Sequence, residues 1–259
     1  GIVLLFAGVE VQAVHASEME NPKKQYPLAI FISSIIVFAL FTFGSLAIAA
    51  VVPNSQLQLE SGLMQALSTM LNAVNMKWVM YILAFCVAFG SLGGVLSWIS
   101  GPSKGLLSTA KDGILPETLA KTTKSGAPKN MMLIQGFIVT ILACLYFVMK
   151  DVSVAFFLLS ALTVAVYIIM YLMMYMAAIV LRKSQPNLER PYKAPALPLL
   201  AGIGILAAIF ALVLSFVPPS QLPIGNPASY IAIVAIGTIG FFIIPLIIAK
   251  VRKNKIINQ

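Results

Sequence analysis

Apolar segments near the length of a lipid bilayer recur along this chain, and they limit its possible folds more than any other feature. A run of about 20 apolar residues crosses a hydrocarbon core about 30 Å thick. In lipid such a run must be a helix, because a helix satisfies its own backbone N–H and C=O groups. The sequence therefore predicts an all-α polytopic membrane protein. The expected segments cover residues 1–16, 28–52, 77–100, 131–149, 152–181, 197–217 and 228–249.

The low content of charged residues argues against a soluble domain. Charged residues make up 10% of the 259-residue chain, whereas soluble domains average about 25%. The formal net charge of +9 could indicate nucleic-acid binding, but the basic residues fall between the apolar segments, as they do in membrane proteins. Cys86 and Cys144 each lie inside an apolar segment, so we expect no disulfide framework, no metal site and no cofactor.

The first apolar segment, 1–16, is shorter than a full span. It begins at Gly1, with no initiator Met, basic region or cleavage site before it. We expect a helix cut by the start of the chain, followed by six full spans. Residues 1–259 would then form the C-terminal part of a longer membrane domain.

The distribution of Lys and Arg predicts the orientation in the membrane. Only Lys77 and Lys150 lie on one side, and the other basic residues lie on the opposite side. By the positive-inside rule the basic connectors and the C-terminus are cytoplasmic. On the outer side, connector 53–76 contains a helix-like stretch, 63–74, which we expect to lie at the surface. The basic residues assigned to the cytoplasm are Lys23, Lys24, Lys104, Lys111, Lys121, Lys124, Lys129, Arg182, Lys183, Arg190, Lys193, Lys250, Arg252, Lys253 and Lys255.

Glu10 is the one acidic residue deep within an apolar segment. An ionisable group in hydrocarbon costs at least about 2.5 kcal/mol, so it should face a partner or a watery cavity. Gly8 lies two residues earlier, and a glycine there suits a helix that unwinds and exposes backbone groups to a solute or ion. This pattern favours a coupling or proton-carrying carboxyl beside a substrate site. The alternative is a packing glycine with a structural carboxyl bonded to another helix.

Three tyrosines recur on one face of segment 152–181. Tyr167, Tyr171 and Tyr175 stand at i, i+4 and i+8, which places them along one helical stripe. Tyr167 and Tyr171 lie inside the span, where each hydroxyl needs a partner. They either line a polar path or bond across helices, while Tyr175 favours a packing or interface role.

Other polar or small residues have simpler interpretations. His15, the one histidine in the sequence, could sense pH, but a position near the cytoplasmic end favours contact with water. Small residues cluster in segment 77–100, and close helix packing explains them better than substrate binding. These small residues are Gly90, Ser91, Gly93 and Gly94.

Two stretches resemble the amino acid–polyamine–organocation superfamily of transporters. Gly8 to Glu10, with the stretch 18–30, is similar to that superfamily's sixth helix and the loop that follows. The stretches 111–116 and 126–128 are similar to its loop after helix eight. Within the superfamily, 163–167 with Tyr171, and 97–99 before Gly101 and Pro102, look most like bacterial glutamate/γ-aminobutyrate antiporters.

The resemblance covers the whole chain, as helices six to twelve of a twelve-helix protein. It implies half of an inverted-repeat fold like that of the leucine transporter, with substrate held between broken helices one and six. Helix one, in the missing N-terminal half, would complete the site. The implied roles are substrate binding for Leu4, Phe6, Ala7, Gly8, Tyr167 and Tyr171, coupling or gating for Glu10, and a possible helix-eight lining for Ser91 and Gly94.

One position departs from the antiporter pattern. Where those antiporters place an acidic residue on helix eight, this chain has Gly94. The resemblance therefore implies amino-acid transport without implying glutamate/γ-aminobutyrate specificity.

The expected activity is secondary active transport of amino acids or related amines across the cytoplasmic membrane. It would work by alternating access, as antiport or with proton coupling. A channel would need polar rings along several spans, and a membrane enzyme would need paired acid/base or metal-binding groups. A structural membrane subunit is the remaining alternative, against which Glu10 beside Gly8 is the main feature.

Overall fold

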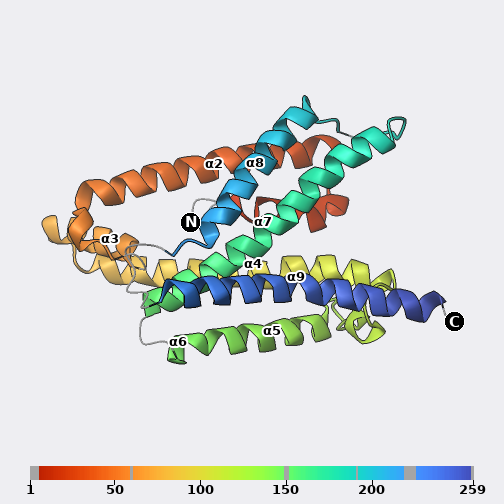
Figure 1. Ribbon diagram of the computed structural model, residues 1–259. Coiled ribbons are helices and arrows are strands. Elements are labelled where there is room, and N and C mark those ends of the chain that lie inside the picture. The colour runs from red at the N-terminus through yellow and green to blue at the C-terminus, as the bar shows by residue number, and fades with distance from the viewer. Residues whose placement is uncertain (1–5, 59–60, 149–151, 191, 219–225, 258–259) are drawn as a thin grey trace.

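The computed structural model describes residues 6–58, 61–148, 152–190, 192–218 and 226–257, and every regular element within them is a helix (Figure 1). The α-helices are α2 (Pro22–Val51), α3 (Gly62–Ala73), α4 (Val79–Lys111), α5 (Lys129–Ala143), α6 (Leu145–Val148), α7 (Val152–Ser184), α8 (Leu197–Ser215) and α9 (Pro227–Ile257). The 3-10 helices are η1 (Val9–Glu18), η2 (Asn54–Gln56) and η3 (Glu117–Ala120). The predicted all-α fold is confirmed.

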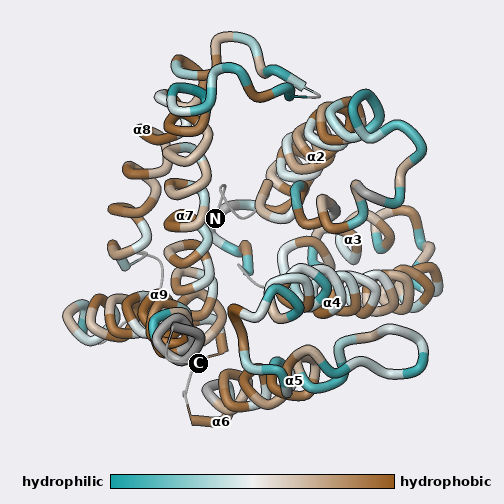
Figure 2. Tube along the Cα trace, turned by 90° about the vertical axis from the view of Figure 1, so that its right-hand side faces the viewer, coloured by the Kyte–Doolittle hydropathy of each residue, from teal (hydrophilic) through white to brown (hydrophobic). Residues whose placement is uncertain are grey.

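Six helical stretches in the described part of the chain are long and apolar enough to cross a membrane, as the sequence predicts. Hydrophilic residues gather in the connections between them (Figure 2). Most large apolar side chains on these helices face outward, as in a protein surrounded by lipid. The six stretches are Pro22–Val51, Val79–Lys111, Lys129–Val148, Val152–Ser184, Leu197–Ser215 and Pro227–Val251.

Helix α7 lies at the centre of the packing. In its most apolar stretch 33% of the residues are buried, against 11% or less in the other spans. Leu158 and Ala165 of α7 form a buried cluster with Tyr230 and Val234 of α9. Helix α8 also packs closely on α7, where Figure 2 shows the two side by side. A central helix of this kind is a stable platform for a site.

Helix α4 continues beyond the point at which its apolar segment ends. The sequence places the end of that apolar segment near residue 100, with a polar connector from Pro102 onward. In the structure α4 runs on to Lys111. A proline inside a membrane helix is tolerated when a neighbouring helix satisfies the carbonyl that it leaves free, and such a partner is present here, as described below.

Segment η1 lies between α2 and α4 and contacts both (Figure 1, red end of the colour scale). Two glycines of α4 let it approach closely. A Cβ atom on Gly101 would lie 2.5 Å from Cγ1 of Val11, and one on Gly105 would lie 3.5 Å from Cγ1 of Val14. Gly101 and Gly105 therefore serve packing against η1, whereas a Cβ on Gly90, Gly93 or Gly94 would meet nothing within 4 Å.

The ends of the helices agree with an alternating topology. The first residues of α2 and α5, the last residues of α4 and α7, and the C-terminal end of α9 lie at one end of the bundle (Figure 1). Helix α3 lies near the other end, which confirms that a short helix occupies the connector between the first two spans.

Candidate functional site

The chain breaks its helical path at Gly8. Phe6 is helical, Ala7 and Gly8 form a turn, and the 3-10 helix η1 starts at Val9. Gly8 has φ 103°, a left-handed conformation that glycine adopts without the steric penalty of a Cβ atom. Runs of 3-10 helix as long as η1 are uncommon and often mark a functional hinge. The unwinding that the sequence suggests at Gly8 is thus present.

Glu10 is held by the two tyrosines of the α7 stripe. The hydroxyl of Tyr167 donates to Oε1 of Glu10 at 2.8 Å, and the hydroxyl of Tyr171 donates to Oε2 at 2.9 Å. Both carboxyl oxygens are therefore satisfied by groups from another helix. Hydrogen bonds to a charged acceptor are the stronger kind, so they offset part of the cost of placing the carboxyl in an apolar segment. The bonds also tie η1 to α7.

A row of aromatic rings flanks this carboxyl, with three tyrosines of α7 and one tryptophan of α4. The rings of Tyr167 and Tyr171 meet edge to face, with their centroids 5.2 Å apart. Trp98 of α4 meets Tyr167 in the same way at 5.9 Å. At the other end the ring of Tyr175 packs on Gly204 of α8, where a Cβ would lie 2.8 Å from Tyr175 Cζ. Tyr175 therefore has the packing role that the sequence favours.

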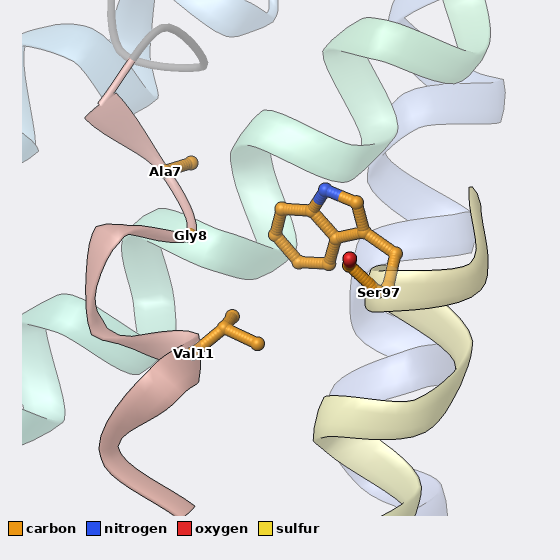
Figure 3. A pocket seen from close by; sticks show the side chains of 5 residues that line it. Ala7, Gly8, Val11 and Ser97 are labelled. Atoms are coloured by element: carbon orange, nitrogen blue, oxygen red, sulfur yellow. The ribbon is translucent and has the colours of Figure 1, made fainter. Parts of the chain in front are cut away.

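A small pocket opens between the break in the chain and α4. Its volume is about 110 Å³, and Ala7, Gly8, Val11, Ser97 and Trp98 line it. In Figure 3 Ala7 and Val11 project from the segment around Gly8 toward Ser97 on the facing helix. Since Trp98 lines the pocket and also contacts Tyr167, the pocket adjoins the Glu10–tyrosine cluster.

A polar contact anchors the far end of η1. Lys104 of α4 donates to Oε1 of Glu18, and Nδ1 of His15 lies 2.7 Å from the other Glu18 oxygen and 3.1 Å from the Lys104 amine. Glu18 lies outside the six spanning helices. The hydrogen bond from Lys104, and then the one from His15, lowers the pKa of the Glu18 carboxyl. In the described residues no group of three His, Cys, Asp or Glu side chains could hold a metal ion.

The residues singled out from the sequence fall into three groups. Ala7 and Gly8 line the pocket, and Glu10, Tyr167 and Tyr171 form the cluster beside it.

The other predicted residues do not join this site. Phe6 is 37% exposed and is not among the lining residues, and Leu4 lies outside the described residues. Ser91 and Gly94 are exposed on α4 and do not line this pocket either; the Ser91 hydroxyl donates to Val87 of its own helix. Their roles at helix eight remain a prediction.

Three residues of the site were not predicted as lining residues. Val11, Ser97 and Trp98 look like ordinary members of apolar segments. Trp98 carried the best signal, because it is one of two tryptophans in the chain and its indole N–H is a polar group within a span. The sequence alone does not reveal that its ring stands against Gly8, since the two are 90 positions apart.

Comparison with known sequences decides the family. Residues 1–241 match the family described as amino acid permease. The chain belongs to the amino acid permease family. This membership confirms the resemblance to the amino acid–polyamine–organocation superfamily, and with the six apolar helices it makes the chain part of a multi-pass membrane protein.

Individual relatives of this permease chain are transporters. It is 38% identical over 256 residues to an uncharacterised transporter of Legionella pneumophila, covering 97% of the chain and 55% of the relative. It is 35% identical over 260 residues to a glutamate/γ-aminobutyrate antiporter of Lactococcus lactis, covering 98% and 52%. A probable agmatine/putrescine antiporter of the same species is 26% identical over 273 residues, covering 100% and 56%. The chain thus spans about half the length of the curated relatives it matches.

Proposed function

We propose that the protein containing this chain is a secondary active transporter that exchanges amino acids or related amines across the cytoplasmic membrane. The observation that carries the proposal is the Glu10 carboxyl, held by Tyr167 and Tyr171 directly beside the break at Gly8. Membership in the permease family and the antiporters among its relatives support it.

The break and the carboxyl together suit a zwitterionic or amine substrate. Where a membrane helix unwinds, freed backbone N–H groups can bind a carboxylate. A carboxylate such as Glu10 attracts an ammonium group, which amino acids and polyamines share. This chemistry supports the substrate class, because it concerns only the carboxylate and ammonium groups. It does not determine which side chain the substrate carries.

The hydrogen bonds of Glu10 provide a physical basis for gating. They join two separate elements, η1 and α7, so any movement of η1 away from α7 must break both of them. A substrate ammonium or a proton can replace one tyrosine hydroxyl as the partner of Glu10. This replacement would change the free energy needed to move η1 away from α7. Alternating access is then coupled to occupancy of the carboxyl, whether the second species is another amino acid or a proton.

The pocket in this chain is one part of the proposed site. Small-molecule sites usually have volumes of about 300–1,000 Å³, and the pocket beside Gly8 has about 110 Å³. We propose that an N-terminal half, corresponding to the remaining length of the relatives, supplies the other part. The orientation proposed from the basic connectors places the C-terminus in the cytoplasm.

Three alternatives are less well supported. A channel would place polar groups along several spans, whereas the cluster described here sits beside one break. A membrane enzyme is not the activity associated with permeases and antiporters. A structural subunit would account for a carboxyl bonded to another helix, but not for the break at Gly8 and the pocket beside it.

The test is exchange by the full-length protein in proteoliposomes. Labelled glutamate, γ-aminobutyrate, agmatine and putrescine would be offered outside, with each unlabelled compound trapped inside in turn. The proposal predicts uptake of at least one label that depends on a trapped amino acid or amine, or on a proton gradient. Uptake that needs neither would indicate a channel, and no uptake of any amino acid or amine would contradict transport.

A further inference from the structure

Pro102 leaves one backbone carbonyl of α4 without its usual partner. In an α-helix the N–H of each residue donates to the carbonyl four residues earlier, and proline has no N–H. The affected carbonyl belongs to Trp98, the residue whose side chain lines the pocket. Inside a membrane an unpaired carbonyl is costly, so a neighbouring group is expected to satisfy it.

Gln135 of α5 is that neighbour. Its Nε2 donates to the Trp98 carbonyl at 3.4 Å, and its Oε1 accepts a hydrogen bond from the Ser103 hydroxyl at 2.8 Å. Ser103 is buried, with 2% of its surface exposed. The Gln135 side chain therefore contacts α4 on both sides of Pro102, from within an apolar helix where an amide without partners would be destabilising.

The position of the Trp98 backbone determines where its ring stands. A Cβ on Gly8 would lie 2.6 Å from Cζ2 and 3.0 Å from Cη2 of Trp98, so the ring lies directly on the break in the chain. The same ring meets Tyr167, which holds Glu10. A small displacement of the α4 backbone at Trp98 would move a wall of the pocket and one neighbour of the tyrosine cluster.

We infer that Gln135 is a positioning residue of the transport site, which fixes the Trp98 ring against Gly8 by holding the carbonyl that Pro102 frees. The inference rests on the proposed function for its consequence in transport. Gln135 does not line the pocket and acts through Trp98. A residue that merely packs α5 on α4 would lack this dependence on Pro102.

Pro102→Ala distinguishes a role of Gln135 in positioning Trp98 from a role in packing α5 on α4. Alanine at 102 restores a backbone N–H that can donate to the Trp98 carbonyl, which makes the amide of Gln135 dispensable for that carbonyl. In the full-length protein Gln135→Met is expected to raise the apparent KM for exchange about three- to tenfold, the range for loss of a neutral hydrogen bond. In the Pro102→Ala background the same change should raise KM less than about twofold. Thr140→Val is the matched control on α5, because the Thr140 hydroxyl donates within its own helix.

A second readout does not require transport. The emission of Trp98 is obtained by subtracting, for each variant, the spectrum of the same variant carrying Trp98→Phe. Gln135→Met should shift this emission, and Pro102→Ala combined with Gln135→Met should return it toward that of Pro102→Ala alone. If the wild-type protein takes up no amino acid or amine, the proposed function fails, while the Trp98 emission still decides the role of Gln135.

Equal effects of Gln135→Met in both backgrounds, in KM and in emission, would overturn the inference and make Gln135 a packing residue. The inference would also be overturned if Gln135→Met changed neither KM nor the Trp98 emission in the protein that retains Pro102. If Gln135→Met does not accumulate as folded protein, Gln135→Glu gives the same comparison. It keeps the side-chain length and an acceptor for Ser103, and as a carboxylate it has no N–H to donate.

Discussion

At the scale of single residues, the site consists of a carboxyl and the two hydroxyls that satisfy it. Glu10 can be identified from the sequence because an acid inside an apolar segment is costly unless it faces a partner or a cavity, and Gly8 is identified by its position two residues before that acid. The spacing of Tyr167 and Tyr171 shows that they share a helix face but not what they face. Their partner is Glu10, more than 150 positions away, and contacts of that separation have no local signature in one sequence.

Tyr171→Phe tests whether the hydroxyl acts in transport. The change keeps the ring and removes the donor to Oε2 of Glu10. Hydrogen bonds to charged groups contribute about 1.5–3 kcal/mol, which corresponds to about 10- to 100-fold. We expect exchange by the full-length protein to lose at least about tenfold in rate or apparent affinity.

The matched control is Tyr175→Phe, because the Tyr175 ring packs on Gly204 and phenylalanine preserves that packing. Exchange with normal rate and affinity in Tyr171→Phe would reduce that tyrosine to a packing residue of α7.

At the scale of elements, η1 is a short segment held at both ends and contacted by two helices. Gly8 allows the turn at its start, the Lys104–Glu18 contact holds its end, and α2 and α4 flank it. The sequence predicts the break but not the 3-10 geometry of the residues that follow it. The apolar segment ends near residue 100, whereas α4 continues to Lys111; the hydrogen bond from Gln135 to the Trp98 carbonyl, which comes from another element, is not visible in the sequence.

Gly8→Ala tests the break itself. Alanine at φ 103° would be strained by about 1–3 kcal/mol, and its Cβ would lie 2.6 Å from the Trp98 ring. We expect a lower melting temperature and at least about a tenfold loss of exchange. Gly44→Ala on α2 is the control, because a Cβ there meets nothing within 4 Å. If Gly8→Ala behaves like Gly44→Ala in both measurements, the break is not required.

Glu18→Gln tests the anchor at the end of η1 through its pH dependence. The contacts with Lys104 and His15 lower the folded-state pKa of Glu18 below its usual value of 4.5. Their stabilising effect is therefore present above pH 4.5 and is lost as the pH falls through the lowered pKa. The melting temperature of the full-length protein in detergent should exceed that of Glu18→Gln near pH 7, and the difference should shrink below pH 4.5.

Glu20→Gln removes an exposed carboxyl two residues away and is the matched control. A difference between wild type and Glu18→Gln that stays constant down to pH 3.5 would show that the carboxylate contact contributes nothing.

At the scale of the whole molecule, α7 is one of six spanning helices in the described part of the chain; α8 and α9 pack against it, and η1 carries the candidate site beside α2 and α4. The number of spans follows from the length of the apolar runs alone. The identity of the site's walls does not, because the Trp98 ring, the Gly8 turn and the α7 tyrosines come from three separate elements. The central claim is that the Glu10 carboxyl, held between η1 and α7, couples substrate occupancy to movement.

Exchange by full-length Glu10→Gln in proteoliposomes, measured from pH 5.5 to 7.5 beside wild type and Glu20→Gln, tests this claim most directly. The amide keeps the shape of the side chain but replaces one acceptor oxygen with a donor that faces a tyrosine hydroxyl. We predict normal membrane insertion, with exchange reduced at least about tenfold, as for lost hydrogen bonds to a charged group, or without the wild-type pH dependence. Wild-type exchange at every pH in Glu10→Gln would contradict the claim and leave Glu10 a structural carboxyl.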